Sequence, residues 1–404
     1  MIRPRFLLDN APFLAVGALL TFLSSFGQTF FISIFAGEIR ATFSLTHGEW
    51  GGLYMIGTSA SAVVMVWAGS LTDHFRVRSL GPVVLLGLAC ACVAMALNPY
   101  AAMLPVVIFA LRFFGQGMSS HIAVVAMARW FIARRGRALA IATLGFSVGE
   151  AVLPLTFVSL MAVMDWHILW LVGAVICLSG GPVLFWLLGK ERTPQSLAES
   201  EHRAGMKGRH WRRSDALRHA LFWCMVPAIL GVFAFITAFF FHQVHLAGVK
   251  GWSHVEFVAF FPLYTVTGIA GMWGAGWALD KLGTARLMPF YQIPLAVGFL
   301  VLALSGSTMG LAVAIVLLGA ATGANATLPN AFWAEFYGTA HIGAIKALAA
   351  AVMVLGSAVG PGLTGVLIDF GVGLETQFIG VAVYFIVTTC LVGWGVRRAA
   401  RMLG

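Results

Sequence analysis

Twelve apolar stretches, each long enough to form a membrane-crossing helix, limit the fold of this chain more than any other feature. They centre near residues 24, 60, 88, 115, 148, 178, 234, 265, 297, 322, 355 and 387. A helix of about 20 apolar residues spans the hydrocarbon core of a bilayer. Only 10% of the residues are charged, whereas soluble domains carry about 25%. The sequence therefore predicts an all-α membrane protein with twelve transmembrane helices.

The basic residues set the orientation of these spans. Of the 25 Lys and Arg residues, Arg40 and Lys250 fall in predicted outer loops and Arg112 falls inside a span. The others lie at the termini or in alternate loops, so the positive-inside rule places both termini in the cytoplasm. The net charge of +10 follows this topology, and no basic stripe interleaves with exposed aromatic residues. A nucleic-acid partner is therefore not expected.

The chain divides into two halves that repeat one another. We expect a six-helix bundle over residues 1–189, a cytoplasmic linker over 190–219 and a second six-helix bundle over 220–404. Five positions recur in the second half at one constant offset: Gly69, Asp73, Gly136, Gly149 and Pro154 match Gly276, Asp280, Gly343, Gly356 and Pro361. A six-span unit duplicated in parallel orientation is the architecture of one large class of secondary transporters.

Several other classes of protein are not supported. The five cysteines lie inside predicted spans, so they do not indicate a disulfide framework. An ATP-driven pump needs a phosphate-binding G-x-x-x-x-G-K-[ST] loop, which the sequence lacks. No nucleophile stands with a base and an orienting group at plausible depth, so we do not expect an enzyme. No cofactor is expected either.

Four motifs resemble those of the major facilitator superfamily, in its bacterial type. They are GSLTDHFRVR (69–78), LRFFGQG (111–117), GFSVGEAVLP (145–154) and VLGSAVGP (354–361). The resemblance covers the whole chain. It implies a fold of two six-helix pseudo-repeats, transport by alternating access, a location in the bacterial inner membrane and a chain that acts as a monomer.

The resemblance also implies a cytoplasmic gate beside span 2. The residues assigned to it are Gly69, Asp73, Arg76, Arg78, Asp280 and Arg286. The Asp73 carboxylate can pair with arginines and helix ends in one conformation and release them in the other. Asp280 and Arg286 form a looser second copy. The alternative is that these charges only flank the spans and set topology.

Arg112 and Glu150 are predicted to form a central pair in spans 4 and 5. A central arginine costs about 2.5–3.5 kcal/mol on insertion scales, so it requires a partner or an aqueous cavity. Glu150 is a carboxylate placed in the middle of the membrane, where it can exchange a proton as its surroundings change. The alternative is a static ion pair that holds the two helices together.

Polar stripes on spans 1, 4, 7 and 10 mark the expected substrate cavity, since these helices line the cavity in the superfamily. The residues are Thr21, Ser24, Ser25, Gln28, Gln116, His242, Gln243, His245, Thr322 and Asn325. The alternative for each is a hydrogen bond between helices, worth about 0.6–2 kcal/mol. His242 and His245 could titrate, bind substrate or lie at the headgroup level.

The sequence thus predicts a symporter for a small solute, with protons and the bilayer as its other partners. The segment 130–149 is similar to a branch of monocarboxylate and dicarboxylate porters. That branch binds carboxylate through an arginine in span 8, but residues 263–277 carry no charge here. Anion transport would then rest on Arg112, which Glu150 could neutralise. Drug or metabolite efflux remains an alternative, as does copper-like metal import by soft ligands, although no metal site is assigned.

Overall fold

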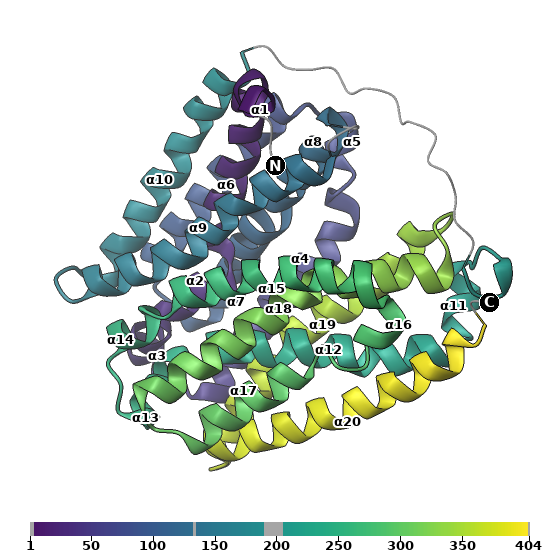
Figure 1. The fold of residues 1–404 in the computed structure, drawn as a ribbon. Coiled ribbons are helices and arrows are strands. Elements are labelled where there is room, and N and C mark those ends of the chain that lie inside the picture. Colours follow the sequence, from purple (N-terminus) through teal and green to yellow (C-terminus); the bar gives the residue numbers. More distant parts are fainter. Residues whose placement is uncertain (1–3, 132–134, 190–204, 403–404) are drawn as a thin grey trace. The chain divides into compact units, whose positions relative to one another are not determined.

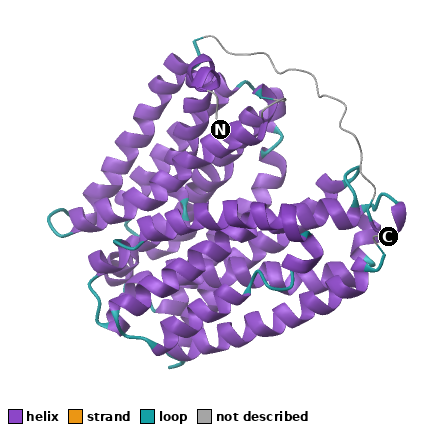
Figure 2. Cartoon of the chain, in the orientation of Figure 1, coloured by secondary structure: helices purple, strands orange, loops and turns teal. Residues whose placement is uncertain are grey.

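The computed structural model describes residues 4–131, 135–189 and 205–402, and within these ranges every regular element is helical (Figure 2). The all-α fold class is therefore confirmed. The contacts divide the chain into two compact units. Unit 1 comprises Met1–Glu199 with Phe240–Val244, and unit 2 comprises Ser200–Phe239 with His245–Gly404. Part of the predicted linker, residues 190–204, lies outside the described residues.

The described part of unit 1 contains six long helical stretches, and Figure 1 labels their helices. These are α1 (Pro4–Leu23), α4 (His47–Ala68), α6 (Val77–Ala96), α7–η4–α8 (Leu104–Leu111, Arg112–Ser119, Ser120–Trp130), α9 (Arg135–Met161) and α10 (Trp166–Leu187). The short elements are η1 (Ser24–Gly27), α2 (Thr29–Ile32), η2 (Ser33–Phe35), α3 (Ala36–Phe43), α5 (Leu71–His74) and η3 (Ala101–Met103). The η4 segment is π-helical, a rare winding that occurs frequently at functional sites.

Unit 2 contains the remaining helices. They are α11 (Arg213–Leu217), α12 (Ala220–Phe241), α13 (Gln243–Lys250), α14 (His254–Val258), α15 (Phe261–Leu282), α16 (Thr284–Leu287), α17 (Ile293–Leu304), α18 (Thr308–Tyr337), α19 (Ile342–Asp369) and α20 (Leu374–Ala400), with the short turn η6 (Met206–Gly208). Residues Phe240–Val244, at the end of α12 and the start of α13, belong to unit 1. Within unit 2, α15 packs along α18 and α17 packs along α20.

Eleven described helical stretches are long and apolar enough to cross a membrane. A shorter apolar helix, Ile293–Leu304, lies where the ninth span is predicted. The preceding helix ends at Leu287, before Pro289, and α17 begins with Pro294 in its first turn. The fixed φ and missing N–H donor of proline suit the first turn of a helix. Proline alone does not end a helix in this chain, since α9 and α19 contain Pro154 and Pro361 in their interiors.

Glycines allow the closest helix pairs in both units. A Cβ on Gly145 of α9 would lie 1.9 Å from the Ala18 carbonyl oxygen of α1. A Cβ on Gly323 of α18 would lie 1.9 Å from the Gly268 carbonyl oxygen of α15. Any side chain at these positions would force the helices apart. Small residues of this kind permit tight packing in a bilayer, where no hydrophobic driving force operates between helices.

The duplication extends to helix caps. The Thr46 side chain accepts from the Glu49 backbone, and the Glu49 carboxylate accepts from the Thr46 backbone, at the start of α4. Ser253 and Glu256 form the same capping box at the start of α14. The two boxes lie at the same sequence offset as the repeated glycines. Each box satisfies two backbone donors that a helix start leaves unpaired.

The second part of the predicted linker is folded onto unit 2. Met206 and Trp211 are buried. The Trp211 indole donates to the Met206 carbonyl at 3.1 Å, and the Trp211 backbone N–H donates to the Tyr337 carbonyl at 3.2 Å. The Lys207 backbone N–H donates to the Met402 carbonyl at 2.7 Å. Residues 205–219 therefore belong structurally to the second bundle.

Candidate functional site

Span 1 is broken in its middle. The α1 helix ends at Leu23, a 3₁₀ turn covers Ser24–Gly27, and Gln28 is extended with φ −87° and ψ 153° before α2 resumes at Thr29. The break fits closely against span 4. A Cβ on Gly27 would lie 2.1 Å from the Leu111 carbonyl oxygen, and a Cβ on Gly115 would lie 2.6 Å from the Gly27 Cα. Only glycine at both positions permits this approach.

Arg112 lies beside this break and is only 2% exposed. Its Nη1 donates to the Gly27 carbonyl at 3.3 Å and to the Thr29 Oγ1 at 3.2 Å. Its Cζ lies 5.6 Å from the centre of the Tyr54 ring of α4, within the range of a cation–π contact. The Tyr54 and Thr29 hydroxyls are hydrogen-bonded at 2.5 Å. We call Gly27, Thr29, Tyr54 and Arg112 the Arg112 cluster.

The Arg112 Nε has no hydrogen-bond partner among the described residues. Hydrogen bonds of Arg112 go to Gly27 and Thr29. Glu150, its predicted partner, is half-buried on α9, and the central pair stays a prediction. A proton-carrying role for Glu150 does not depend on that pair and stays a prediction.

The predicted cavity residues of span 1 have different surroundings. The Thr21 hydroxyl donates to the Ala142 carbonyl of α9, and the Ser24 hydroxyl donates to the Thr21 carbonyl at 2.6 Å. The Ser25 Oγ is buried and has no hydrogen-bond partner in the described part of the chain. Gln28 is half-buried at the break. Thr21 thus makes a hydrogen bond between helices and Ser24 makes one within its own span, whereas Ser25 and Gln28 lie next to the Arg112 cluster in sequence.

On span 4, Gln116 is exposed, and the buried Ser119 donates to the Leu20 carbonyl at 2.9 Å. In a regular α-helix the i, i+4, i+7 spacing would place Arg112, Gln116 and Ser119 on one face. The π-helical winding of Arg112–Ser119 adds a residue to the turn, so the α-helical spacing rule does not hold there.

On span 7, Gln243 is fully buried, and its Nε2 donates to the Ser33 Oγ at 2.8 Å and to the Phe30 carbonyl at 3.2 Å. His242 is buried with its ring centre 6.0 Å from that of His47, and His245 is half-buried. On span 10, the Thr322 hydroxyl donates to the Leu318 and Gly319 carbonyls of its own helix, and Asn325 is half-buried.

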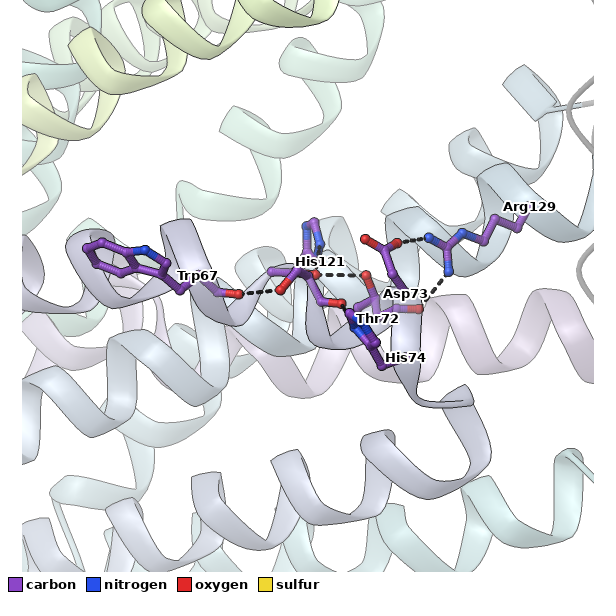
Figure 3. Close-up of polar contacts among 8 residues, drawn as sticks. Trp67, Thr72, Asp73, His74, His121 and Arg129 are labelled. Atoms are coloured by element: carbon purple, nitrogen blue, oxygen red, sulfur yellow. Dashed lines mark hydrogen bonds and ion pairs between the residues drawn. The ribbon is translucent and has the colours of Figure 1, made fainter.

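The predicted gate contains an ion pair at the end of span 2. The Arg129 guanidinium of α8 pairs with the Asp73 carboxylate, and its Nη1 donates to the Thr72 carbonyl at 2.6 Å (Figure 3). The His121 Nε2 lies 3.1 Å from the Gly69 carbonyl oxygen, in the same turn. Two side chains of span 4 therefore hold the loop after span 2.

The other predicted gate residues do not share this arrangement. Arg76 and Arg78 are exposed and have no hydrogen-bond or ion-pair partner within the described ranges, so Asp73 pairs with Arg129 instead. Asp280 and Arg286 are exposed as well and have no such partner there. Lys281 lies over the Trp277 ring at 4.1 Å. The repeat in sequence thus does not extend to a second gate pair.

Sequence reasoning missed Thr29, Tyr54 and Arg129. Tyr54 is in line with Thr58 and Ser61 on α4, and all three are buried. The spacing i, i+4, i+7 marks one helix face, so this polar stripe on span 2 could have been found. Thr29 could not, because its position follows from the break. Nothing in the described residues gathers three or more His, Cys, Asp or Glu side chains that could hold a metal ion.

Apolar helices long enough to cross a membrane define a multi-pass membrane protein. The family model of the Major Facilitator Superfamily matches residues 17–361. The chain therefore belongs to the major facilitator superfamily, which indicates a transporter rather than an enzyme. No curated protein matches it.

Solved structures of transporters share the fold. A bacterial homolog of the human lysosomal transporter Spinster is 16% identical over 97% of this chain and 98% of that one, with a TM-score of 0.73. The nucleoside transporter NupG is 13% identical over 96% of this chain and 99% of that one, with a TM-score of 0.71. At these identities the likeness concerns the fold.

Proposed function

We propose that this protein is a secondary active transporter that moves a small solute across the bacterial inner membrane by alternating access, in symport with protons. The observation that carries the proposal is Arg112, a 2% exposed cation in the middle of span 4 opposite a break in span 1. Ionisable groups at this depth are costly and mark solute or ion pathways. Broken membrane helices likewise occur where the backbone lines a binding site.

The roles of the other residues follow from their positions. Glu150 carries the proton, because it is a half-buried carboxylate one residue after Gly149. A Cβ on Gly149 would lie 2.1 Å from the Ser25 Oγ, next to the break. The Asp73–Arg129 pair holds the cytoplasmic end of span 2 against span 4 in one state and opens in the other. The polar residues predicted on spans 7 and 10 contribute further contacts to the solute path, and the protein works as a monomer.

Reconstituted vesicles test this function. We expect Glu150→Gln to abolish accumulation driven by a proton gradient and to leave solute exchange intact, because exchange needs no net proton movement. Glu38→Gln is the matched control, since Glu38 is an exposed carboxylate on α3 and should change neither reaction. If Glu150→Gln accumulates solute as the unaltered protein does, the proton role assigned to Glu150 is wrong.

A further inference from the structure

We infer that the docked part of the linker and the end of α20 together bind anionic phospholipid headgroups of the cytoplasmic leaflet. We call residues 205–219 and 394–402 the basic surface. This inference goes beyond the proposed function, because it concerns a lipid partner and holds whichever solute the protein moves.

The basic surface carries a large excess of positive charge. Its sequence holds one acidic residue, Asp215, against eight basic ones: Lys207, Arg209, Arg212, Arg213, Arg218, Arg397, Arg398 and Arg401. All eight basic residues are exposed, and none of them forms an ion pair within the described ranges. Glu335 of α18 is an exposed carboxylate near this surface, and it has no ion pair there either. Clusters of about four to eight lysines and arginines beside a membrane span bind anionic lipids.

The two segments of the basic surface are held together, so their charges form one patch. The Lys207 backbone N–H donates to the Met402 carbonyl at 2.7 Å. In Figure 1 the end of α20 lies beside α11. Burial, followed by the charges of Lys207, Arg209 and Arg398, lowers the pKa of His219. Cations from both segments therefore lie around this one side chain.

The alternative is that these charges only set the topology of the neighbouring spans. Topology requires basic residues in the loop but no fixed position for them. Here the segment buries Met206 and Trp211 against unit 2 and leaves its basic side chains outside. A Cβ on Gly205 would lie 2.5 Å from the Gly338 nitrogen and from the Phe336 carbonyl oxygen. The fold thus presents the charges at fixed positions, as a binding surface needs.

Exposed tryptophans place the basic surface at the level of the headgroups. Trp223, at the start of α12, is 54% exposed, and its indole donates to the Leu217 carbonyl at 2.8 Å. Trp394 of α20 is 53% exposed, and the Arg398 Cζ lies 5.7 Å from the centre of its ring. Exposed tryptophans gather at membrane–water interfaces, and the positive-inside rule assigns this interface to the cytoplasm. Phosphate groups lie at this level, and arginine binds them through paired donors.

The lipid has a physical consequence for the linker. Docking brings the five cations of residues 205–219 beside the three of α20. Like charges held close together repel one another and destabilise a compact arrangement. Anionic headgroups offset this repulsion, so they favour the docked linker over the undocked one.

Hydrogen exchange of residues 205–219 tests the inference on the full-length protein in nanodiscs. One sample contains phosphatidylcholine alone, and the other contains phosphatidylcholine and phosphatidylglycerol in equal parts. We expect exchange at least about fivefold slower with phosphatidylglycerol, since each basic residue near an anionic surface contributes an attraction of this size. The difference should disappear at about 1 M salt, where the Debye length falls to about 3 Å.

Two double variants assign the effect to the basic surface. Arg398→Gln with Arg401→Gln lies outside the measured segment and should reduce the lipid-dependent slowing at least about twofold. Arg78→Gln with Arg137→Gln is the matched control, because it removes two exposed arginines of unit 1 and should keep the slowing. An anionic bilayer also lowers the pH at its surface, but this acts on both variants alike. If the first variant does not fold, native mass spectrometry of the unaltered protein should show phosphatidylglycerol retained in preference to phosphatidylcholine.

Equal exchange in the two bilayers would overturn the inference, as would slowing that Arg398→Gln with Arg401→Gln retains in full or that persists at high salt. Equal retention of the two lipids in native mass spectrometry would do the same. Slowing by millimolar inorganic phosphate in phosphatidylcholine alone, to the same extent, would assign the surface to a soluble anion and contradict the lipid. Solute movement in vesicles tests the transport function separately and is not decided by any of these results.

Discussion

At the scale of single residues, the contact between Asp73 and Arg129 decides how the gate is interpreted. Asp73 was expected to act with Arg76 or Arg78, which follow it in the same loop. The structure pairs it with Arg129, which also donates to the Thr72 carbonyl. Both side chains are partly exposed, and such pairs contribute at most about 1 kcal/mol to stability. Their conformational role, rather than their contribution to stability, is therefore the property to test.

We predict that Asp73→Asn and Arg129→Gln each slow solute turnover several-fold, and that the double variant is no slower than either single one. A pair that acts as a unit gives this non-additive result. Solute affinity, measured by thermal shift, should change little. Arg78→Gln serves as the comparison, because Arg78 has no described ion-pair partner. Additive effects of the two substitutions on turnover would show that the residues act separately.

His219 provides a pH-dependent contact in the docked linker. It is half-buried, and its ring centre lies 4.9 Å from that of Trp211. Burial lowers the pKa of His219, and the positive charges of Lys207, Arg209 and Arg398 lower this pKa further. The folded linker thus binds the proton less well than the unfolded one. The contribution of neutral His219 to the stability of the folded linker is complete above the ordinary histidine pKa of about 6.5. This contribution is lost as the pH falls from there through the lowered pKa of His219.

We predict that hydrogen exchange of residues 205–219 becomes faster when the pH falls from about 7.5 to about 5.5, after correction for the intrinsic exchange rate. His219→Phe keeps an aromatic ring beside Trp211 and should remove this pH dependence. His210→Phe alters a histidine on the exposed part of the same segment and should leave the dependence in place. Acid-induced exchange that persists in His219→Phe would assign the effect to another group.

At the scale of elements, the break in span 1 is the feature that positions the Arg112 cluster. Two glycines, Gly27 and Gly115, permit the contact between the break and span 4. The atoms that a Cβ would meet are mainly backbone atoms, which cannot move as the end of a flexible side chain can. Overpacking of this kind typically costs about 1–3 kcal/mol. The same displacement would also move the Gly27 carbonyl away from the arginine.

We predict that Gly27→Ala lowers the melting temperature and slows solute transport in vesicles. Gly276→Ala is the matched control, because a Cβ there meets no atom within 4 Å and alanine in a helix is favoured over glycine by about 0.5–1 kcal/mol. It should be neutral or slightly stabilising. A Gly27→Ala protein with unchanged melting temperature and unchanged solute transport would rule out a close contact at the break.

At the scale of the whole molecule, the apolar runs and their offset predicted the fold class correctly. Hydropathy is a strong signal because the backbone of an apolar segment in lipid must form its hydrogen bonds internally, as a helix does. Spans of this kind are recognised one at a time, without knowledge of their neighbours. The ninth span was less well predicted, since the structure gives it a helix of only Ile293–Leu304.

The candidate site was only partly predictable. Arg112 was found because a charge inside an apolar run is conspicuous. Its surroundings were not, because the break at Gln28 and the π-helical segment Arg112–Ser119 carry no hydropathy signal. Both depend on glycines that meet across two helices, and a single sequence does not show which glycines meet. The partner of Asp73 was not predicted either, because Arg129 is distant from it in sequence and a single sequence does not show which distant residues meet.

The central claim is that the break in span 1 lies on a solute path that opens to each side of the membrane in turn. The most direct test places one cysteine at Gln28 in a chain whose five native cysteines are replaced, and labels it with a membrane-impermeant thiol reagent in right-side-out and inside-out vesicles. The account predicts labelling from both faces. Labelling from neither face, or from one face only under all conditions, would contradict it.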